Sequence, residues 1–552
     1  MKYILAIDAG TTSNRAILFD EDARVISVAQ KSFRQFFPHP GWVEQDPAEI
    51  LATTVGVCAE AIAQAQVDRK DIVAMGITNQ RETTILWDKK TGRAIAPAIV
   101  WQCRRTADRA EAVKEAGYGD MIREKTGLEV DAYFSATKIA YILDHVKGAR
   151  EKAEKGEVLF GTVDSFLLYH LTGGVHRTDI SNASRTMLFN IHSLDWDEAL
   201  LKLFNIPRAC LPEVLPTAAH FGDTLAEHFG ISIPITGMIG DQQSALFGEQ
   251  CFEVGEVKST FGTGAFVLMN TGHAPIISEH GLLSSCAWDI GEGPVYAMEG
   301  SIFACGSVIQ WLKDDLGLIA SPDETAALAE SVTEKNPMVF VPAFTGLGTP
   351  YWDPEARGTI FGISRSTTKA HLVKAALDAI AYMSADVIDA MEKDLKASHD
   401  RILVDGGVSH NDYLMRTLAD AIHRSVHRPA LVETTALGAA FMAGMGCGLY
   451  KDIADIKKRA SKAQVFAPTG ADLTAERARW KKAVAPPWPI TWIDRRRPGA
   501  EFLSRDPHHP PAFPKSWGGS SRDRHRETAR SHPNRFRPHP PVRGDLFLHR
   551  KG

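Results

Sequence analysis

The sequence has few cysteines and no long apolar run. Seven cysteines among 552 residues, with no C-x-x-C pair, argue against a disulfide scaffold and against the common zinc patterns. No apolar run approaches the ~20 residues of a membrane span, so we expect no integral membrane segment. The few unpaired cysteines predict a reducing, cytoplasmic setting. The apolar run at the start of the chain is too short for a signal peptide.

Two familiar phosphate-binding motifs are also missing. The chain contains no Gly-Lys dipeptide, which excludes a Walker A loop, and no G-x-G-x-x-G, which excludes the simple dinucleotide fingerprint. The composition, 44% hydrophobic and 23% charged, is that of an ordinary globular protein with room for a large core. Any phosphate chemistry must therefore use other turns.

Charge is distributed unevenly along the chain. Residues 485–552 contain 14 Lys or Arg, 6 Asp or Glu and 12 of the 29 prolines, a formal charge of +8, whereas the rest carries −13. We predict that this basic Pro/Arg/His-rich tail is disordered, because it shows no hydrophobic period. It is either an inert or frame-shifted extension or a segment that binds RNA or acidic surfaces. The acidic body argues against a nucleic-acid partner.

The body alternates strands and helices, which indicates an α/β fold. Residues 3–7 predict a buried strand that ends at Asp8, followed by the turn 10–13 and by strands over 16–20 and 25–28. Residues 49–66 have helical spacing, and residues 71–78 predict another buried strand. A stripe over 372–391 with three- and four-residue steps predicts a core helix.

A similar unit returns in the second half. Residues 256–261 run into Gly262-Thr263-Gly264 and then into 265–269, again strand, turn, strand, and 401–404 end at Asp405-Gly406-Gly407. Two similar halves predict two related domains, over residues 1–250 and 251–484, with a catalytic cleft between them.

The Gly/Thr turns are candidates for phosphate binding. Backbone N–H groups in such turns form anion-binding concavities, and Thr hydroxyls add donors. A plain hairpin turn is the alternative for either turn alone. Asp8, beside the first turn, could hold Mg²⁺ directly or through water, or could cap the turn.

These motifs resemble the actin-like ATPase superfamily and, within it, the FGGY carbohydrate kinases, most closely the members that phosphorylate glycerol. The resemblance covers about residues 2–484 and implies two actin-like (ribonuclease-H-like) domains. Its most specific segments lie at residues 76–84, 100–106, 133–138, 240–243, 342–354 and 358–378.

The resemblance also implies a role for particular residues. The family's glycerol-contacting positions correspond to Arg81, Glu82, Tyr133, Asp241 and Gln242. The family's aromatic residues that pack on the glycerol carbons correspond to Trp101 and Phe266. The phosphate loops match Thr11, Thr12, Ser13 and Arg15 in the first turn and Thr263 in the second. Positions around the nucleotide match Gly306, Gln310, Gly407 and Asn411.

The implied reaction is transfer of the γ-phosphoryl group of ATP to glycerol, giving sn-glycerol 3-phosphate. Asp241 is the expected general base, and Asp8 and Asp241 are the expected Mg²⁺ ligands. A three-carbon polyol needs several hydrogen-bonding groups and a small apolar wall, which these residue types supply.

Three alternatives remain at this point. The chain could be an FGGY kinase for another polyol or sugar, although Trp101 and Phe266 would narrow a site for a longer substrate. It could be a non-enzymatic actin-like nucleotide switch, which leaves Arg81 and Glu82 unexplained. It could be RNA-associated through its tail. The family resemblance further implies a homodimer or homotetramer.

Overall fold

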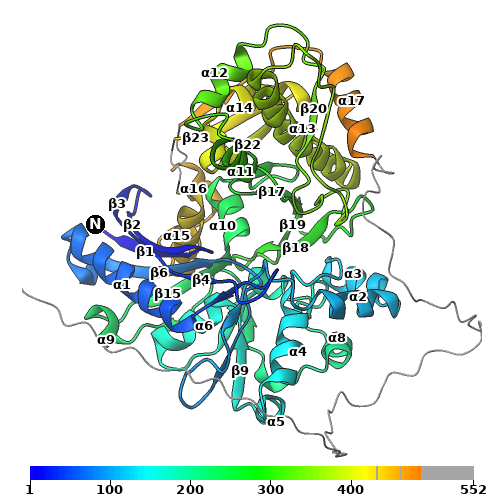
Figure 1. Cartoon of the computed structure of the whole chain (residues 1–552). Coiled ribbons are helices and arrows are strands. Elements are labelled where there is room, and N and C mark those ends of the chain that lie inside the picture. The colour runs from blue at the N-terminus through cyan, green and yellow to red at the C-terminus, as the bar shows by residue number, and fades with distance from the viewer. Residues whose placement is uncertain (431–432, 460–461, 486–552) are drawn as a thin grey trace, which may run out of the picture. The chain divides into compact units, whose positions relative to one another are not determined.

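The computed structural model describes residues 1–430, 433–459 and 462–485 (Figure 1). The predicted disorder of the tail concerns residues that lie, except for Ala485, outside this part of the chain. That interpretation therefore stays a prediction.

The first half is built on a six-stranded sheet in the order β14-β15-β6-β1-β2-β3. Strands β1, β2 and β3 form an antiparallel meander, and β6 and β15 continue the sheet parallel to β1. The bounds are β1 Tyr3–Ala9, β2 Ser13–Asp20, β3 Val25–Ser32, β6 Ile72–Asn79, β14 Gly222–Asp223 and β15 Pro234–Gly240. The strands predicted over 3–7, 16–20, 25–28 and 71–78 are thus confirmed.

The second half repeats this arrangement in a seven-stranded sheet ordered β18-β19-β17-β16-β22-β23-β24. Strand β16 pairs antiparallel with β17 and parallel with β22, as β1 does with β2 and β6. The bounds are β16 Val257–Phe261, β17 Ala265–Gly272, β18 Leu283–Trp288, β19 Val295–Ile302, β22 Arg401–Asp405, β23 Ser425–Pro429 and β24 Ala463–Phe466. The predicted internal repeat is therefore present in three dimensions, and the exact domain boundary at residue 250 stays a prediction.

Shorter elements are added to both halves. Those in the first half are β4 Gln35–Phe36, β5 Glu44–Gln45, β7 Ile85–Asp88, β8 Ala98–Ile99, β9 Val158–Gly161, β10 Arg177–Asp179, β11 Phe189–Asn190, β12 Asp195–Trp196, β13 Glu213–Leu215, α2 Ala107–Glu115, α3 Gly119–Thr126, α4 Ser135–His145, α5 Ala149–Glu154, α6 Val163–Thr172, α7 Ile180–Ala183, α8 Glu198–Phe204 and α9 Ala226–Phe229. Those in the second half are α11 Gly306–Gln310, α12 Glu324–Glu330, α14 Asp412–Ile422, α16 Ile453–Lys457, α17 Thr474–Val484, β20 Val339–Val341 and β21 Thr359–Phe361.

Two long helices cover the sheets. Helix α13 (Lys369–Leu395) contains the predicted stripe, and Ile380, Val387 and Met391 on it are buried in the core of the second half. Helix α1 (Pro47–Ala65) packs on β2 and β3. In the part of the chain that the structure describes, only α1 is long and apolar enough to cross a membrane by length and composition, a test that a core helix also passes.

Helix α15 (Thr434–Gly446) joins the two halves. It comes late in the chain, yet it packs on β1, β6 and β15 of the first sheet and on α10 (Asp241–Gly248). Glycine makes this close approach possible: a Cβ on Gly438 would lie 1.9 Å from the Ser244 carbonyl oxygen, and one on Gly76 would lie 2.2 Å from the Ala439 carbonyl oxygen. A helix from late in the chain, between strands β23 and β24 of the second sheet, therefore supports the helix that begins at Asp241.

We expect Gly438→Ala to lower the free energy of unfolding by about 1–3 kcal/mol, because the new methyl group meets backbone rather than a side chain that can move. Gly56→Ala is the matched control. Gly56 lies inside α1 and a Cβ there would face open space, so alanine should stabilise the protein by about 0.5–1 kcal/mol. Urea denaturation followed by circular dichroism measures both. Equal stability of Gly438→Ala and wild type would contradict the packing described here.

Candidate active site

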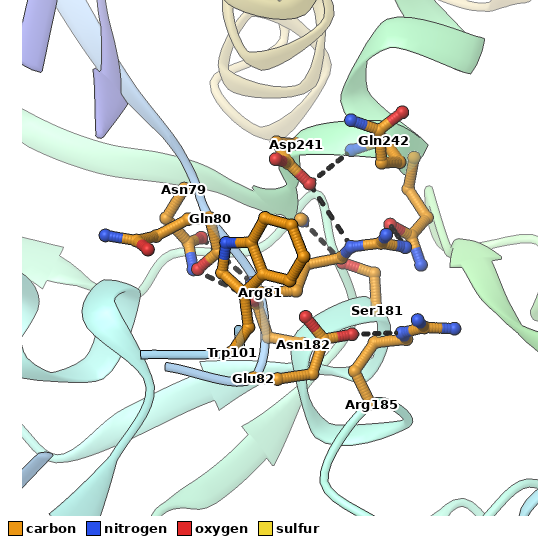
Figure 2. Close-up of polar contacts among 12 residues, drawn as sticks. Asn79, Gln80, Arg81, Glu82, Trp101, Ser181, Asn182, Arg185, Asp241 and Gln242 are labelled. Atoms are coloured by element: carbon orange, nitrogen blue, oxygen red, sulfur yellow. Dashed lines mark hydrogen bonds and ion pairs between the residues drawn. The ribbon is translucent and has the colours of Figure 1, made fainter. Parts of the chain in front are cut away.

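Charged side chains gather at one edge of the first sheet, where three neighbouring parallel strands end. Asp8 lies near the end of β1, Arg81 follows β6 by two residues, and Asp241 begins α10 directly after β15. Strands β1 and β15 both pair with β6, so these residues are brought together although they are far apart in the sequence. Figure 2 shows Arg81, Glu82 and Asp241 in one group.

Asp241 is held by one ion pair and one hydrogen bond. The Nε of Arg81 lies 3.2 Å from its Oδ1, and the backbone N–H of Gln242 donates to the same oxygen at 2.7 Å. Its side chain keeps 26% exposure, so a ligand can reach it. Burial raises the pKa of Asp241 above the usual range, against the opposing charges of Arg81 and Lys258. A carboxylate with a raised pKa accepts a proton more readily than an ordinary one.

Glu82 sits in a strained backbone conformation beside Arg81. Its φ is +60°, in the left-handed region that non-glycine residues rarely adopt, and such strain concentrates at functional sites. The Ser135 hydroxyl donates to its carbonyl oxygen at 2.9 Å, and the Nε of Arg185 donates to its Oε1 at 2.6 Å. Burial raises the pKa of Glu82, and the charges of Arg185 and Arg81 oppose this.

Three aromatic side chains form a wall near these charges. The Trp101 ring lies 5.6 Å from the Tyr133 ring and 6.2 Å from the Phe266 ring, both in edge-on arrangements. Phe266 comes from β17 in the second half, so the wall is built from both halves. The Nε1 of Trp101 donates to the Thr11 hydroxyl at 3.0 Å, which ties the wall to the first turn.

The first turn is a tight reversal between β1 and β2. The Gly10 N–H donates to the Ser13 carbonyl at 3.1 Å, and the Thr12 side chain is exposed. The Ser13 hydroxyl accepts from the Gln30 amide at 3.0 Å. Arg15, predicted to contact phosphate, forms an ion pair with Glu433 at the start of α15.

The second turn packs against the start of α11. The Thr263 carbonyl accepts from the backbone N–H groups of Cys305 at 3.0 Å and Ser307 at 3.1 Å, and the Gly306 N–H donates to the Gly262 carbonyl at 2.9 Å. The structure therefore brings Thr263 and Gly306 together, as the predicted phosphate and nucleotide positions require.

The other predicted nucleotide positions are less closely grouped. A Cβ on Gly306 would lie 3.3 Å from Val408, so the loop after β22, which includes the exposed Gly407, lies beside α11. Asn411 caps α14 and donates to the Thr325 hydroxyl at 2.8 Å. Gln310 is exposed at the end of α11. These positions all belong to the second half of the chain.

The residues available for a divalent cation are carboxylates. Burial raises the pKa of Asp8 to about 7; Arg15 opposes the rise, and the negative charges of Asp241 and Glu433 add to it. Within residues 1–430, 433–459 and 462–485 no group of three or more His, Cys, Asp or Glu is arranged around a common metal position. Asp8 and Asp241 still offer the oxygen ligands that Mg²⁺ prefers, and their mutual repulsion favours a cation between or near them.

Four residues near this group were not predicted: Arg185, Gln243, Lys258 and Glu299. The Lys258 ammonium donates to the Gln242 side-chain oxygen at 2.5 Å, and the Gln243 side-chain oxygen accepts from Arg81 at 3.1 Å. A signal for Glu299 does exist in the sequence, because it is an isolated acid within the otherwise uncharged strand β19. Arg185 has no comparable local signal.

Comparisons with known proteins agree with this architecture. Residues 3–248 match the N-terminal domain of the FGGY family of carbohydrate kinases, and residues 257–447 match its C-terminal domain. The chain is 53% identical over 488 residues to glycerol kinase 2 of Thermotoga maritima, covering 88% of this chain and 98% of that protein. It is 52% identical over 489 residues to the glycerol kinase of Paraburkholderia phymatum, covering 88% and 97%.

Solved structures give the same result. The crystal structure of Plasmodium falciparum glycerol kinase with ADP matches with a TM-score of 0.82 at 35% identity, covering 88% of this chain and 98% of that one. A xylulose kinase from Lactobacillus acidophilus matches with a TM-score of 0.78 at 20% identity, which shows a shared fold. Because both family domains match in order along one chain, and the two repeated sheets carry them, this chain belongs to the FGGY family of carbohydrate kinases.

Proposed function

We propose that this protein transfers the γ-phosphoryl group of ATP to glycerol, giving sn-glycerol 3-phosphate and ADP. The observation that carries the proposal is the convergence of Arg81, Glu82 and Asp241 beside an aromatic wall that is hydrogen-bonded to the first turn. Curated relatives at 52–53% identity, named glycerol kinases, support the choice of substrate.

Glycerol would bind in the first domain, residues 1–250, where Phe266 of the second domain, residues 251–484, adds to the wall. Glu82 and Asp241 accept hydrogen bonds from its hydroxyl groups, Arg81 and Gln242 donate, and Trp101, Tyr133 and Phe266 cover its carbon chain. Charge-assisted hydrogen bonds of this kind contribute roughly 1.5–3 kcal/mol each. A polyol that leaves any of these buried groups unpaired binds less well.

In the chemical step, the terminal hydroxyl oxygen of glycerol attacks the γ-phosphorus while its proton passes to Asp241. The bond from the γ-phosphorus to the bridging oxygen breaks, and ADP leaves with that oxygen. The backbone N–H groups and hydroxyls at Thr11, Thr12, Ser13 and Thr263 stabilise the charge on the transferred group. Positioning is the main task of the protein, because the reaction needs no covalent intermediate with it.

The nucleotide would lie along the second half. Arg15 breaks its ion pair with Glu433 and approaches the phosphates instead. The residues around the base and ribose are Gly306, Gln310, Gly407 and Asn411. Asp8 and Asp241 would hold Mg²⁺, directly or through water, and when bound this ion offsets the negative charge of the phosphates.

A substrate panel tests the proposed function. We expect glycerol to exceed erythritol, xylulose and gluconate in kcat/KM by at least about 100-fold, because a site matched to three hydroxyl groups rejects poorly matched polyols. ADP formation measured with each substrate at fixed ATP gives the ratios. A higher kcat/KM for xylulose or gluconate would identify that compound, rather than glycerol, as the substrate. ATP turnover that is independent of all four substrates would favour an actin-like switch.

Chelation tests the cation. Adding excess EDTA should abolish turnover, and added Mg²⁺ should restore it. Asp8→Asn should raise the Mg²⁺ concentration needed for half-maximal activity on the order of tenfold, within the range known for removing a group that supports a metal. Full activity in EDTA, or an unchanged Mg²⁺ requirement in Asp8→Asn, would contradict this part of the proposal.

We also propose a cytoplasmic location and a homodimer or homotetramer. The location is supported by the cysteines, because Cys58, Cys103, Cys210, Cys251, Cys286 and Cys305 are buried free thiols, as expected in a reducing compartment. The oligomer follows from the family resemblance and is measured by light scattering after size-exclusion chromatography.

A further inference from the structure

Four charged side chains form a buried network behind the proposed glycerol site. Arg81, Glu82, Arg185 and Glu299 have relative exposures of 3%, 1%, 0% and 0%. Two of them, Arg81 and Glu82, are expected to contact glycerol. The other two, Arg185 and Glu299, have no role assigned so far, and their ion pairs link Arg81 to Glu82.

Glu299 holds both arginines. The Arg81 guanidinium donates to Glu299 with two nitrogens, Nη1 to Oε2 at 2.5 Å and Nη2 to Oε1 at 3.1 Å. Arg185 donates through Nη2 to the same Oε1 at 3.1 Å. The two arginine charges hold the pKa of Glu299 at about 2, although burial acts in the opposite direction. The carboxylate is therefore charged at all working pH values.

This arrangement fixes the direction of each functional group. Because both terminal nitrogens of Arg81 are bound to Glu299, its Nε is the nitrogen that faces Asp241. Arg185 reaches the other way, through Nε to Glu82, and its guanidinium lies 5.5 Å from the centre of the Tyr133 ring. Figure 2 shows the Arg185–Glu82 and Arg81–Asp241 contacts.

The network also crosses between the halves of the chain. Glu299 lies on β19 of the second sheet, where it pairs with Leu268 and Leu283 on the neighbouring strands. Arg81 and Arg185 belong to the first half. The orientation of the glycerol-binding groups thus depends on a carboxylate supplied by the other half.

A role in stability alone explains the network poorly. Buried ion pairs often contribute little to net stability, because desolvation offsets their attraction. The contacts of Glu299 and Arg185 with Arg81 and Glu82 point instead to a role in holding these two side chains in place.

We propose that Glu299 and Arg185 are positioning residues for substrate binding and phosphoryl transfer: Glu299 orients Arg81 toward Asp241, and Arg185 orients Glu82 and Tyr133. This inference rests on the proposed function, since it assigns what these residues do for the glycerol site. Neither residue is a catalytic residue, because each acts through a neighbour.

The test compares Glu299→Gln, Arg185→Met and the double variant with wild type. We expect each single change to raise the glycerol KM at least tenfold and to lower kcat, while the ATP KM stays within about twofold, because the nucleotide positions are untouched. Since the two residues are in direct contact, the double variant should lose at least threefold less in kcat/KM than the product of the single losses. Multiplicative losses, or equal changes in the glycerol and ATP KM values, would overturn the proposal.

Asp386→Asn is the matched control. Asp386 is a buried carboxylate on α13 that accepts from Arg477 at 2.6 Å and from Trp480 at 2.6 Å, neither of which belongs to the proposed glycerol site. The Asp386→Asn substitution should lower the thermal midpoint and leave the glycerol KM unchanged. A glycerol KM raised tenfold by this control too would assign the effect to lost stability and overturn the proposal.

Arg185→Lys keeps the test decisive if the other variants fail to fold. Lysine keeps the charge but cannot bridge two carboxylates as a guanidinium does, so the glycerol KM should rise at least threefold at an unchanged thermal midpoint. A wild-type KM in Arg185→Lys would count against the proposal. Failure of the proposed function is a separate result, because it would appear as a lack of glycerol-dependent ADP formation in the wild-type protein.

Discussion

Asp241→Asn is expected to lower kcat by about 10²–10⁴-fold while the glycerol KM changes by only a few-fold. An amide has the same shape as the carboxylate and still accepts the hydrogen bond from the Gln242 N–H, although it loses the ion pair with Arg81. It cannot take the proton that the attacking hydroxyl must lose, and general-base catalysis contributes about that factor. The measurement is kcat and KM from glycerol-dependent ADP formation.

Asp420→Asn serves as the control for this change. Asp420 is a buried carboxylate that accepts from the Thr469 N–H at 2.6 Å and from its hydroxyl at 2.8 Å, in the second half of the chain. Its replacement should leave kcat unchanged. If Asp241→Asn turned over within a few-fold of wild type, Asp241 would not be the general base.

Glu82→Ala should raise the glycerol KM by about 10–100-fold, whereas the ATP KM should stay within about twofold of the wild-type value. The change removes an acceptor for a glycerol hydroxyl, a charge-assisted hydrogen bond worth roughly 1.5–3 kcal/mol, and tenfold corresponds to about 1.4 kcal/mol. It also removes one of the two carboxylate partners of Arg185 and leaves only Glu299, so the thermal midpoint should fall.

The isosteric change separates these two effects. Glu82→Gln keeps the volume and one oxygen acceptor and loses only the charge, so its glycerol KM should lie between those of wild type and Glu82→Ala. A glycerol KM that Glu82→Ala does not alter would remove Glu82 from the set of substrate ligands.

The local parts of the fold were predictable from the sequence. The hairpins around turns 10–13 and 262–264 and the helix stripe over 372–391 depend on residues close together in the chain, and all three are present. The gathering of Arg81 and Asp241 was also predicted, through the family resemblance, and the parallel pairing of β6 with β15 explains it.

The long-range parts were not predictable in the same way. The glycines of α15, such as Gly438 and Gly446, indicate a close approach to some neighbour, but they do not tell that the neighbour is the first sheet, with its own glycines Gly76 and Gly237. Arg185 and Glu299 were missed for a related reason: their partners are more than 100 residues away in sequence, and although Glu299 is an isolated acid in an uncharged strand, that signal does not identify its partners. The Arg15–Glu433 pair was likewise hidden from local reasoning.

A crystal structure of the protein grown with glycerol and ADP tests the central claim most directly. We expect glycerol to lie against Trp101, with its hydroxyl groups within about 3 Å of Arg81, Glu82 and Asp241, a normal hydrogen-bond distance. Glycerol bound elsewhere, with the Arg81–Asp241 ion pair intact and no room beside the aromatic wall, would contradict the proposed glycerol site.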